Sequence, residues 1–566
     1  MRGSQEDRDR ERLRSEIHVG GRPAHAGDLS VCLVYPNTYP VGMANLGFQA
    51  VYGMLARSGV VVERAFLPDE KPYRRVRTLE SGRVLSSFDV VAFSLSFETD
   101  YVHVLDVLAA AGIPLRSGDR DERTPVVVAG GPATFLNPEP IAPFVDLFLL
   151  GEAEEMLPEW LAALRSADRL GGGREGRLDA SLEIEGAYVP ARWPALGDPG
   201  AADERPRVRR RYVADLDRAP TQSRILAPEA VFGDMFLVEA SRGCEWGCRF
   251  CAAGFMYRPV RHRSADSLAR SVYDEALPFR STVGLVGAEM ASHPGIAGLC
   301  QEIARRGGRA SPSSLKADLV TPALARALGS GETRSVTIAP EAGSERMRRV
   351  INKNLTEPEI LRAAALLAGS GVNALKLYAM IGLPTEERAD VLAIAELAAK
   401  IRERLPNGVG RITLSINPFV PKPWTPFQWE PMAELPVLRE RTDWLRREAA
   451  RIPGCEVDVE SARDAYWQTL LSRGDRRVAE ILVAVHERGG RFWPVVREAA
   501  RAGGREGLPS PDAYVHRRYA PDEALPWDFI DHHVDKRYLL AEWRKALLER
   551  ETPPCDVASC QACAAC

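Results

Sequence analysis

Short apolar runs alternate with amphipathic segments along the chain from residue 29 to residue 165. The expected strands are Leu29–Tyr35, Val60–Phe66, Val90–Leu95, Val126–Ala129 and Asp146–Leu150, and the expected helices are Gly42–Arg57, Tyr101–Ala111 and Glu152–Arg165. Near-continuous apolar strands that alternate with helices are typical of a buried parallel sheet with right-handed crossovers. The pattern predicts a doubly wound α/β domain over residues 29–165, after a mobile arm of residues 1–28.

Strand and helix patterns alternate again between residues 231 and 430. The expected strands are Phe236–Ala240, Val283–Val286, Ser313–Lys316, Ser335–Ala339, Ala374–Ala379 and Ile412–Asn417. Six strand–helix units in succession predict a second parallel α/β domain, with its functional loops at the carboxyl ends of the strands.

The remaining segments have other patterns. Residues 166–230 are rich in Gly, Pro, Arg and Asp and read as a linker with a short strand pair, whereas residues 431–550 are mainly helical. The basic run Arg207–Arg211 suits a phosphate or RNA, but such runs are more often solvated faces or strips of interdomain salt bridges.

Composition places few limits on function. The chain has 566 residues, enough for three or four domains, and a formal net charge of −3, so there is no global attraction to nucleic acid or anionic lipid. Residues 29–56 carry no charge, but their prolines, asparagines and glycines favour strand, loop and helix over a membrane span. Seven of the ten cysteines fall in two clusters, which indicates metal binding in a reducing compartment and a cytoplasmic protein.

The first cysteine cluster follows the strand at Phe236–Ala240. Cys244, Cys248 and Cys251 have the spacing CxxxCxxC on a turn that is rich in glycine. Iron–sulfur clusters normally take four cysteines, so three thiolates leave one iron with an open position for chemistry. The alternatives are a zinc knuckle, which would need a fourth ligand nearby, or three buried structural cysteines.

The same spacing resembles the signature of the radical S-adenosylmethionine (SAM) superfamily. The resemblance implies a partial TIM barrel of six strands and a [4Fe–4S] cluster on the three cysteines. It also implies that SAM chelates the fourth iron through its amino and carboxylate groups, with Phe250 beside the adenine.

Four loops at the carboxyl ends of the predicted barrel strands extend this resemblance. Gly287-Ala288-Glu289 resembles the motif that meets the SAM amino group, and Ser313 and Lys316 could meet ribose or carboxylate. Glu341 and Arg346 lie in a stretch similar to one that positions SAM, and residues 380–386 resemble the adenine-side loop. Any single fragment is common in α/β loops, but all four occur in the order found in the family.

The first domain resembles the Rossmann-like cobalamin-binding domain that precedes many radical SAM enzymes. The resemblance rests on Gly130-Gly131-Pro132, residues 137–140, Asp146 and residues 151–154. The family's DxHxxG loop is absent after the first strand, so we expect that no histidine ligates cobalt. The alternative is a domain that keeps the fold and holds no cobalamin.

The second cysteine cluster ends the chain in a tail of residues 551–566. Cys555, Cys560, Cys563 and Cys566 could close a site for a second [4Fe–4S] cluster or for tetrahedral zinc. A redox-active tail without metal is the alternative.

Taken with the resemblance, these features predict a radical SAM enzyme that cleaves SAM reductively and is assisted by cobalamin, in methyl transfer or radical rearrangement. Its partners would be an unidentified substrate and an electron donor such as flavodoxin or ferredoxin. Two other hypotheses are an RNA-modifying enzyme of the methylthiotransferase type with two clusters, and a non-catalytic iron–sulfur or zinc protein. The charge balance and the lack of an obvious RNA-binding domain disfavour RNA.

Overall fold

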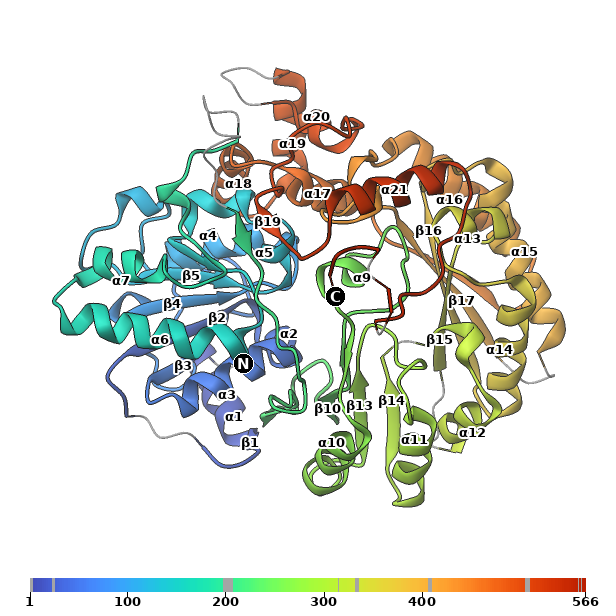
Figure 1. The fold of residues 1–566 in the computed structure, drawn as a ribbon, viewed down its shortest axis with the longest axis horizontal. Coiled ribbons are helices and arrows are strands. Elements are labelled where there is room, and N and C mark those ends of the chain that lie inside the picture. Colours follow the sequence, from blue (N-terminus) through green and yellow to red (C-terminus); the bar gives the residue numbers. More distant parts are fainter. Residues whose placement is uncertain are drawn as a thin grey trace.

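The structure is a computed structural model that describes residues 4–22, 26–196, 207–313, 315–330, 335–405, 410–503, 509–557, 559–560 and 562–565. Two α/β units lie side by side, and a mainly helical C-terminal region bridges them (Figure 1). Within these residues, no helix combines the length and apolar character needed to cross a membrane.

The first unit is built on one sheet with the strand order β3-β2-β4-β5-β6-β7 in the described residues. The strands are β2 (Ser30–Thr38), β3 (Val61–Leu67), β4 (Val90–Ser94), β5 (Val126–Gly130), β6 (Leu147–Leu149) and β7 (Ala187–Tyr188). All neighbours are parallel except β6 and β7. Because β3 and β4 flank β2, the strand order reverses beside β2, which is where doubly wound folds bind ligands.

Helices cover both faces of this sheet, as Figure 1 shows. They are α2 (Tyr39–Met43), α3 (Leu46–Arg57), α4 (Tyr101–Ala110), α5 (Pro132–Leu136), α6 (Ala153–Arg169) and α7 (Gly173–Ser181). The predicted helix from Gly42 is divided, because Asn45 caps the N-terminus of α3 by accepting a hydrogen bond from the Phe48 amide.

Two segments differ from the sequence-based expectation. Residues 5–18, placed in a mobile arm, form α1 (Gln5–Ser15) and β1 (Ile17–His18). Arg12 of α1 is buried against Asp69 and Glu229, which fixes the segment to the domain. Residues 166–230, placed in a linker, contain the end of α6, α7 and the sheet strand β7, because their apolar positions complete the first domain's core.

The second unit contains seven barrel strands in the described residues, one more than predicted. They form two parallel sheets, β10 (Met235–Glu239), β13 (Thr282–Val286) and β14 (Arg309–Pro312), then β15 (Ser335–Glu341), β16 (Ala374–Ile381), β17 (Arg411–Pro418) and β18 (Cys455–Val459). The outer helices are α10 (Ala265–Arg270), α11 (Ile296–Arg305), α12 (Pro322–Ser330), α13 (Glu345–Val350), α14 (Glu357–Gly369) and α15 (Arg388–Arg404). The result is an open, partial barrel.

Two strand predictions in this unit need correction. The third strand ends at Pro312, so Ser313 and Lys316 follow it instead of forming it. The seventh strand, β18, lies in a region predicted to be helical. Glu456 and Asp458 alternate with its apolar positions, as in a half-exposed edge strand, whereas the strand predictions rested on near-continuous apolar runs.

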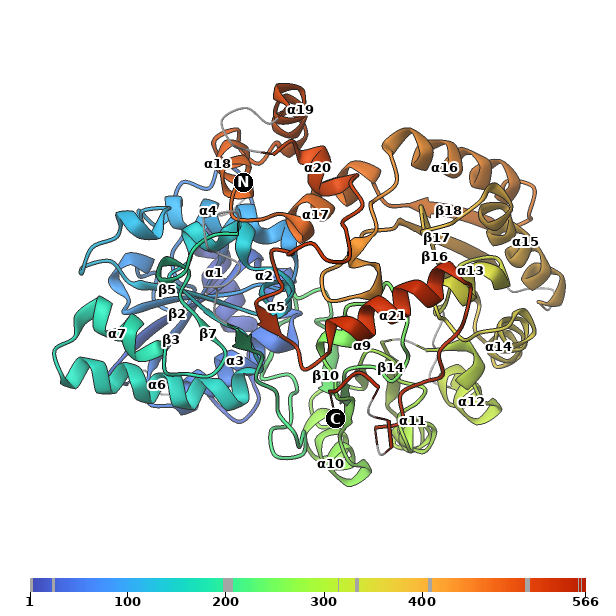
Figure 2. The ribbon, with the colours of Figure 1, turned by 45° about the horizontal axis from the view of Figure 1, so that its top comes forward.

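The C-terminal region packs across both units. Its helices are α16 (Leu435–Ala449), α17 (Ala462–Arg473), α18 (Val478–Glu487), α19 (Phe492–Ala502), α20 (Pro511–Val515) and α21 (Lys536–Leu547). Figure 2 shows α21 lying across the barrel next to α9 (Ala253–Met256).

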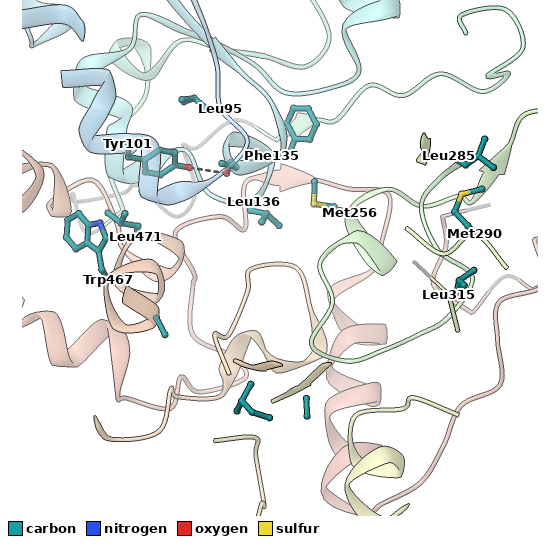
Figure 3. Packing of buried hydrophobic residues seen from close by; sticks show 14 of the residues in the cluster. Leu95, Tyr101, Phe135, Leu136, Met256, Leu285, Met290, Leu315, Trp467 and Leu471 are labelled. Carbon is teal, nitrogen blue, oxygen red and sulfur yellow. Dashed lines mark hydrogen bonds between the residues drawn. The ribbon is translucent and has the colours of Figure 1, made fainter. Parts of the chain in front are cut away.

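One continuous hydrophobic core joins the three parts (Figure 3). It includes Tyr101 and Phe135 of the first unit, Met256 and Leu285 of the barrel, and Trp467 of α17. A core that crosses all the boundaries holds the two α/β units in a fixed mutual position.

The basic run and His532 serve this packing. Arg207 pairs with Asp531, and Arg211 with Glu159, so the run is an interdomain salt-bridge strip. His532 is fully buried, with its Nε2 2.8 Å from the Phe135 carbonyl oxygen and its ring against Trp424. It is therefore a core residue.

We predict that His532 makes the protein sensitive to acid. Burial, followed by the charge of Arg210, lowers the pKa of His532 to about 3. Between that value and the ordinary value of about 6.5, only the unfolded state binds the proton, so stability falls as pH decreases. The free energy of unfolding should fall by about 2 kcal/mol between pH 6.5 and pH 5 from this residue alone.

A His532→Asn variant should show a correspondingly flatter dependence of unfolding on pH between 6.5 and 5, measured by denaturant titration. Equal slopes in the variant and the parent protein would contradict this role.

Candidate functional site

The cysteine turn is the loop of a short antiparallel ribbon formed by β11 (Ser241–Arg242) and β12 (Arg261–His262). Gly243 enters the turn with φ +82°, and a Cβ there would lie 2.6 Å from the Tyr257 carbonyl oxygen. Only glycine fits this position. The turn then carries Cys244, Cys248 and Cys251, followed by α9.

The three thiols lie close together and are largely buried. Burial, followed by the neighbouring Cys248 and Cys251, raises the pKa of Cys244 above its ordinary range. Burial raises the pKa of Cys248 to about 11 and also raises that of Cys251. These free thiols would therefore lose their protons only to a bound cation or metal.

A buried lysine stands beside the thiols. The Nζ atom of Lys353 lies 3.4 Å from Glu341 Oε1. Although burial opposes its charge, Glu341 and Cys248 raise the pKa of Lys353 above the ordinary range. Three thiolates and a cation suit a cluster with net negative charge, so this donor set fits iron–sulfur binding.

Two side chains hold the turn against the barrel and the C-terminus. Arg249 is fully buried and donates to the carbonyl oxygens of Arg349, Val350 and Arg550 and to Glu542. Asn352 donates to the carbonyl oxygen of Gly247 at 3.1 Å. The turn is thus tied to the end of α13 and the residues after it, to α21, and to the segment after α21.

The predicted SAM-binding residues after β13 lie beside this turn. Ser313 donates to the Gly287 carbonyl oxygen at 2.8 Å, and a Cβ on Gly287 would lie 2.5 Å from Ser241 Oγ. The Glu289 carboxylate accepts hydrogen bonds from the amides of Ala291, Ser292 and Lys316, so it shapes the loop.

The remaining predicted SAM-binding residues have protein partners. Lys316 Nζ bonds Asp318 and the Asn354 carbonyl oxygen and lies 3.7 Å above the Trp246 ring. Glu341 sits at a β-bulge with φ +65°, a strained conformation often found at functional sites.

The last two predicted SAM-binding residues are Arg346, which forms ion pairs, and Phe250, which packs against apolar residues. Arg346 pairs with Asp390 and Glu549 and donates to the Thr385 carbonyl oxygen, which links α13 to the loop after β16. Phe250 is half-buried against the apolar cluster that contains Phe419 and Phe427. Phe419 and Phe427 are buried and serve packing.

A cavity of about 400 Å³ separates the sheet of the first unit from the cysteine turn. One wall is a face of the sheet together with α3 and α6, including Leu33, Ala92 and Trp160. The opposite wall includes Gly243, Tyr257 and Gly287 of the barrel. The wall residues are mostly apolar, and no histidine is among those that the described chain contributes.

The predicted cofactor residues Gly130, Gly131 and Pro132 all line this cavity at the carboxyl end of β5. Gly131 has φ +112°, and a Cβ there would lie 2.5 Å from the Leu95 carbonyl oxygen. The glycines bring the backbone close to any ligand at the point where doubly wound sheets bind one.

A buried ionic cluster joins the two walls. Glu152, after β6, accepts from Arg242 at 2.8 Å and from both terminal nitrogens of Arg261 at 2.8 and 2.9 Å. Burial opposes the charge of Glu152, but hydrogen bonds from Arg261 and the charge of Arg242 lower its pKa. Glu154 and Glu239 complete the cluster around Arg242.

The sequence interpretation missed Lys353, Arg242 and Arg261 as parts of the site. Arg242 and Arg261 flank the cysteine turn in the sequence, and this closeness was the available signal that they belong to the site. Nothing in the sequence identified Glu152 as their partner. Lys353 follows α13 and reaches the thiols only through the left-handed turn at Asn352, φ +55°.

The C-terminal tail returns to the cysteine turn. The Cys555 amide donates to the Glu245 carbonyl oxygen at 2.8 Å, and the Cys563 carbonyl oxygen accepts from Asp535 at the start of α21. Cys566 lies outside the described residues. Among the described residues, those of the cysteine turn included, no group of three or more Cys, His, Asp or Glu residues is placed to hold a single metal ion.

Comparisons with known proteins match two family models. Residues 47–190 match "Radical SAM proteins, N-terminal", and residues 238–398 match "Radical SAM superfamily". Together these matches span just over half of the chain. An uncharacterized protein of Methanocaldococcus jannaschii is 29% identical over 464 residues, which are 80% of this chain and 90% of that protein.

Two solved structures are among those that this chain matches. The radical SAM methyltransferase TsrM of Kitasatospora setae has a TM-score of 0.49 and 14% identity, over 68% of this chain and 73% of that one. The cobalamin-dependent SAM radical enzyme OxsB has a TM-score of 0.49 and 12% identity, over 92% of this chain and 79% of that one. These similarities are too low to assign an activity to this chain.

We predict that Glu152→Gln destabilises the protein by about 3 kcal/mol or more, because Arg242 and Arg261 would stay buried without this carboxylate. Thermal unfolding measures the effect. The control is Glu155→Gln, an exposed position in the first turn of α6 just after Glu152, which should change stability by less than about 0.5 kcal/mol. Equal melting temperatures for the Glu152 variant and the parent protein would contradict the interpretation.

Proposed function

Because the chain belongs to the radical SAM superfamily, we propose that this enzyme cleaves SAM reductively at a [4Fe–4S] cluster held by Cys244, Cys248 and Cys251, with cobalamin in the cavity opposite. The observation that carries the proposal is that cavity, which reaches from the switch in strand order of the first sheet to the cysteine turn. Methyl transfer to an unidentified substrate or a radical rearrangement would follow.

The chain's own residues supply binding, position and exclusion of water. The cluster supplies one electron to SAM when bound. Arg249 and Asn352 hold the three thiolates in place, and Lys353 neutralises part of the negative charge beside them. The loop at Gly287, fixed by Ser313, would present backbone groups to SAM. Helix α21 lies across the barrel next to α9, which follows the cysteine turn, and would help to shield this region from water.

Several features support cobalamin as the occupant of the cavity. Glycines 130 and 131 leave the backbone bare at the carboxyl end of β5, and the walls are largely apolar, as a macrocycle requires. Because no described lining residue is a histidine, we propose that cobalt receives no histidine ligand from this chain. When bound, cobalamin would supply a methyl group or a second radical carrier.

The two other hypotheses are weaker. Arg207, Arg210 and Arg211 are engaged with Asp531, Glu152 and Glu159, which leaves this basic run little free charge for RNA. A non-catalytic binding protein would have no need of the strained Glu341 or of buried Lys353 beside the thiols. An electron donor such as flavodoxin or ferredoxin is required by the proposed reaction.

We also propose that Cys555, Cys560, Cys563 and Cys566 hold a second metal centre, either a [4Fe–4S] cluster or zinc. The support is the spacing of four thiols together with the docking of Cys555 beside Glu245. Such a centre would lie near the working cysteine turn.

Cys251→Ala should abolish formation of 5′-deoxyadenosine from SAM and lower the iron bound at the turn, because an iron of the cluster loses its thiolate. The assay uses protein reconstituted without oxygen and reduced with dithionite. Cys455→Ala on β18 is the matched control and should retain both the formation of 5′-deoxyadenosine and the bound iron. If the parent protein with full iron forms no 5′-deoxyadenosine, the proposed enzyme activity is wrong.

Ala92→Phe should lower the affinity for hydroxocobalamin by about tenfold or more, because the ring would project from the sheet into the cavity. The measurement is cobalamin retained after anaerobic purification, read from the visible spectrum. Iron content should not change. Ala109→Phe on the exposed face of α4 is the control. Unchanged retention in the Ala92 variant would place cobalamin elsewhere.

Cys560→Ser should remove the metal of the tail and leave that of the turn. Metal analysis should then show a loss of about four iron atoms per chain or about one zinc atom. Ser559→Ala is the neighbouring control. A parent protein with about four iron atoms and no zinc would contradict a second centre.

A further inference from the structure

A second depression, of about 310 Å³, borders the cavity between the two units. It shares Ala50, Met54, Glu154, Leu157 and Thr221 with that cavity and lies between α3, α6 and residues 218–224. The depression therefore adjoins the cavity along these five residues, and we call it the side mouth of the cavity.

Three arginines surround this mouth, namely Arg57, Arg218 and Arg224. Two of them converge on Gly53 of α3. A Cβ on Gly53 would lie 3.3 Å from Arg224 Cγ and 3.4 Å from Arg57 Nη1. Because Gly53 has no side chain, Arg57 and Arg224 can lie together against this part of α3.

The carboxylates near the mouth are already engaged. Glu154 pairs with Arg242 in the buried ionic cluster, and Glu275 accepts from Gln222. In the described part of the chain, none of the three arginines has a carboxylate within ion-pair distance. Burial, followed by the charge of Arg57, lowers the pKa of Arg224. Arg57 and Arg218 are exposed and Arg224 is half-buried, so water partly screens these charges, and a bound anion would offset the repulsion that remains between Arg57 and Arg224.

We propose that Arg57, Arg218 and Arg224 form an anion site for a phosphate group of the ligand that fills the cavity. Guanidinium groups bind phosphate through paired, charge-assisted hydrogen bonds. The apolar walls of the cavity would hold the body of the ligand, and the three arginines of the side mouth would bind its phosphate group. This inference rests on the proposed function, in which the ligand is cobalamin and the group is the phosphodiester of its nucleotide tail.

A second polar feature of the mouth suits a ligand with hydrogen-bond donors beside the anion. Gln222 is 1% exposed, lines the depression, and its Oε1 atom has no hydrogen-bond partner. Amide or hydroxyl groups of a bound ligand could donate to this oxygen, and such groups are plentiful around the phosphodiester of cobalamin.

The test compares hydroxocobalamin with cobinamide, which has the corrin ring but lacks the nucleotide and its phosphodiester. In the Arg57→Gln/Arg224→Gln variant, the dissociation constant for cobalamin should rise about tenfold at low salt, and that for cobinamide should not change. The control is Arg123→Gln/Arg169→Gln, which removes the same charge from exposed positions outside the cavity. The control should bind both compounds as the parent protein does.

Two outcomes would overturn the anion site alone. One is an unchanged affinity for cobalamin in the double variant, and the other is an equal loss for cobalamin and cobinamide, which would indicate a change in the shape of the cavity. If the parent protein binds neither compound, the cobalamin proposal is wrong.

Inorganic pyrophosphate then tests the arginines independently of cobalamin. Calorimetric titration at low salt should detect binding to the parent protein and weaker binding to the double variant. Equal heats for the two proteins would overturn the site.

Discussion

The buried contact of Glu152 with Arg242 and Arg261 fixes the geometry on which the proposed chemistry depends. Glu152 stands at the carboxyl end of β6, and the two arginines belong to the ribbon that carries the cysteine turn. An ion pair this deeply buried adds little net stability, but it is costly to break. It therefore specifies one mutual orientation of the two sheets, which the shared apolar core then maintains.

That orientation brings the ligand-binding edges of the two sheets together. In parallel α/β folds, ligands bind beyond the carboxyl ends of the strands, and here the ends of β4 and β5 and the end of β13 contribute to one cavity. A cofactor in this space would contact the first sheet on one side and the cysteine turn on the other. The C-terminal region closes the assembly, because Arg249 ties the turn to Glu542 of α21 and to the backbone of Arg550.

Much of this arrangement could be predicted from sequence, and the missing parts have physical causes. Continuous apolar strands identified both parallel sheets, and the cysteine spacing identified the turn. The edge strand β18 was missed because near-continuous apolar runs were the signal used, whereas Glu456 and Asp458 alternate with its apolar residues. Arg346 remains a predicted SAM-binding residue, and its contacts with Asp390 and Glu549 depend on tertiary neighbours that a local motif does not reveal. The same limit applies to Lys353 and to the partners of Arg242.

Electron paramagnetic resonance of the reduced protein, loaded with both the cluster and cobalamin, tests the central claim most directly. The claim is that one cavity places cobalamin against the cysteine turn without a histidine ligand. We expect a cobalt signal without axial nitrogen hyperfine structure, broadened by spin coupling to the cluster, and we expect the broadening to disappear in Cys251→Ala. A cobalt signal with histidine nitrogen splitting, or one that is unaffected by the cluster, would contradict the account.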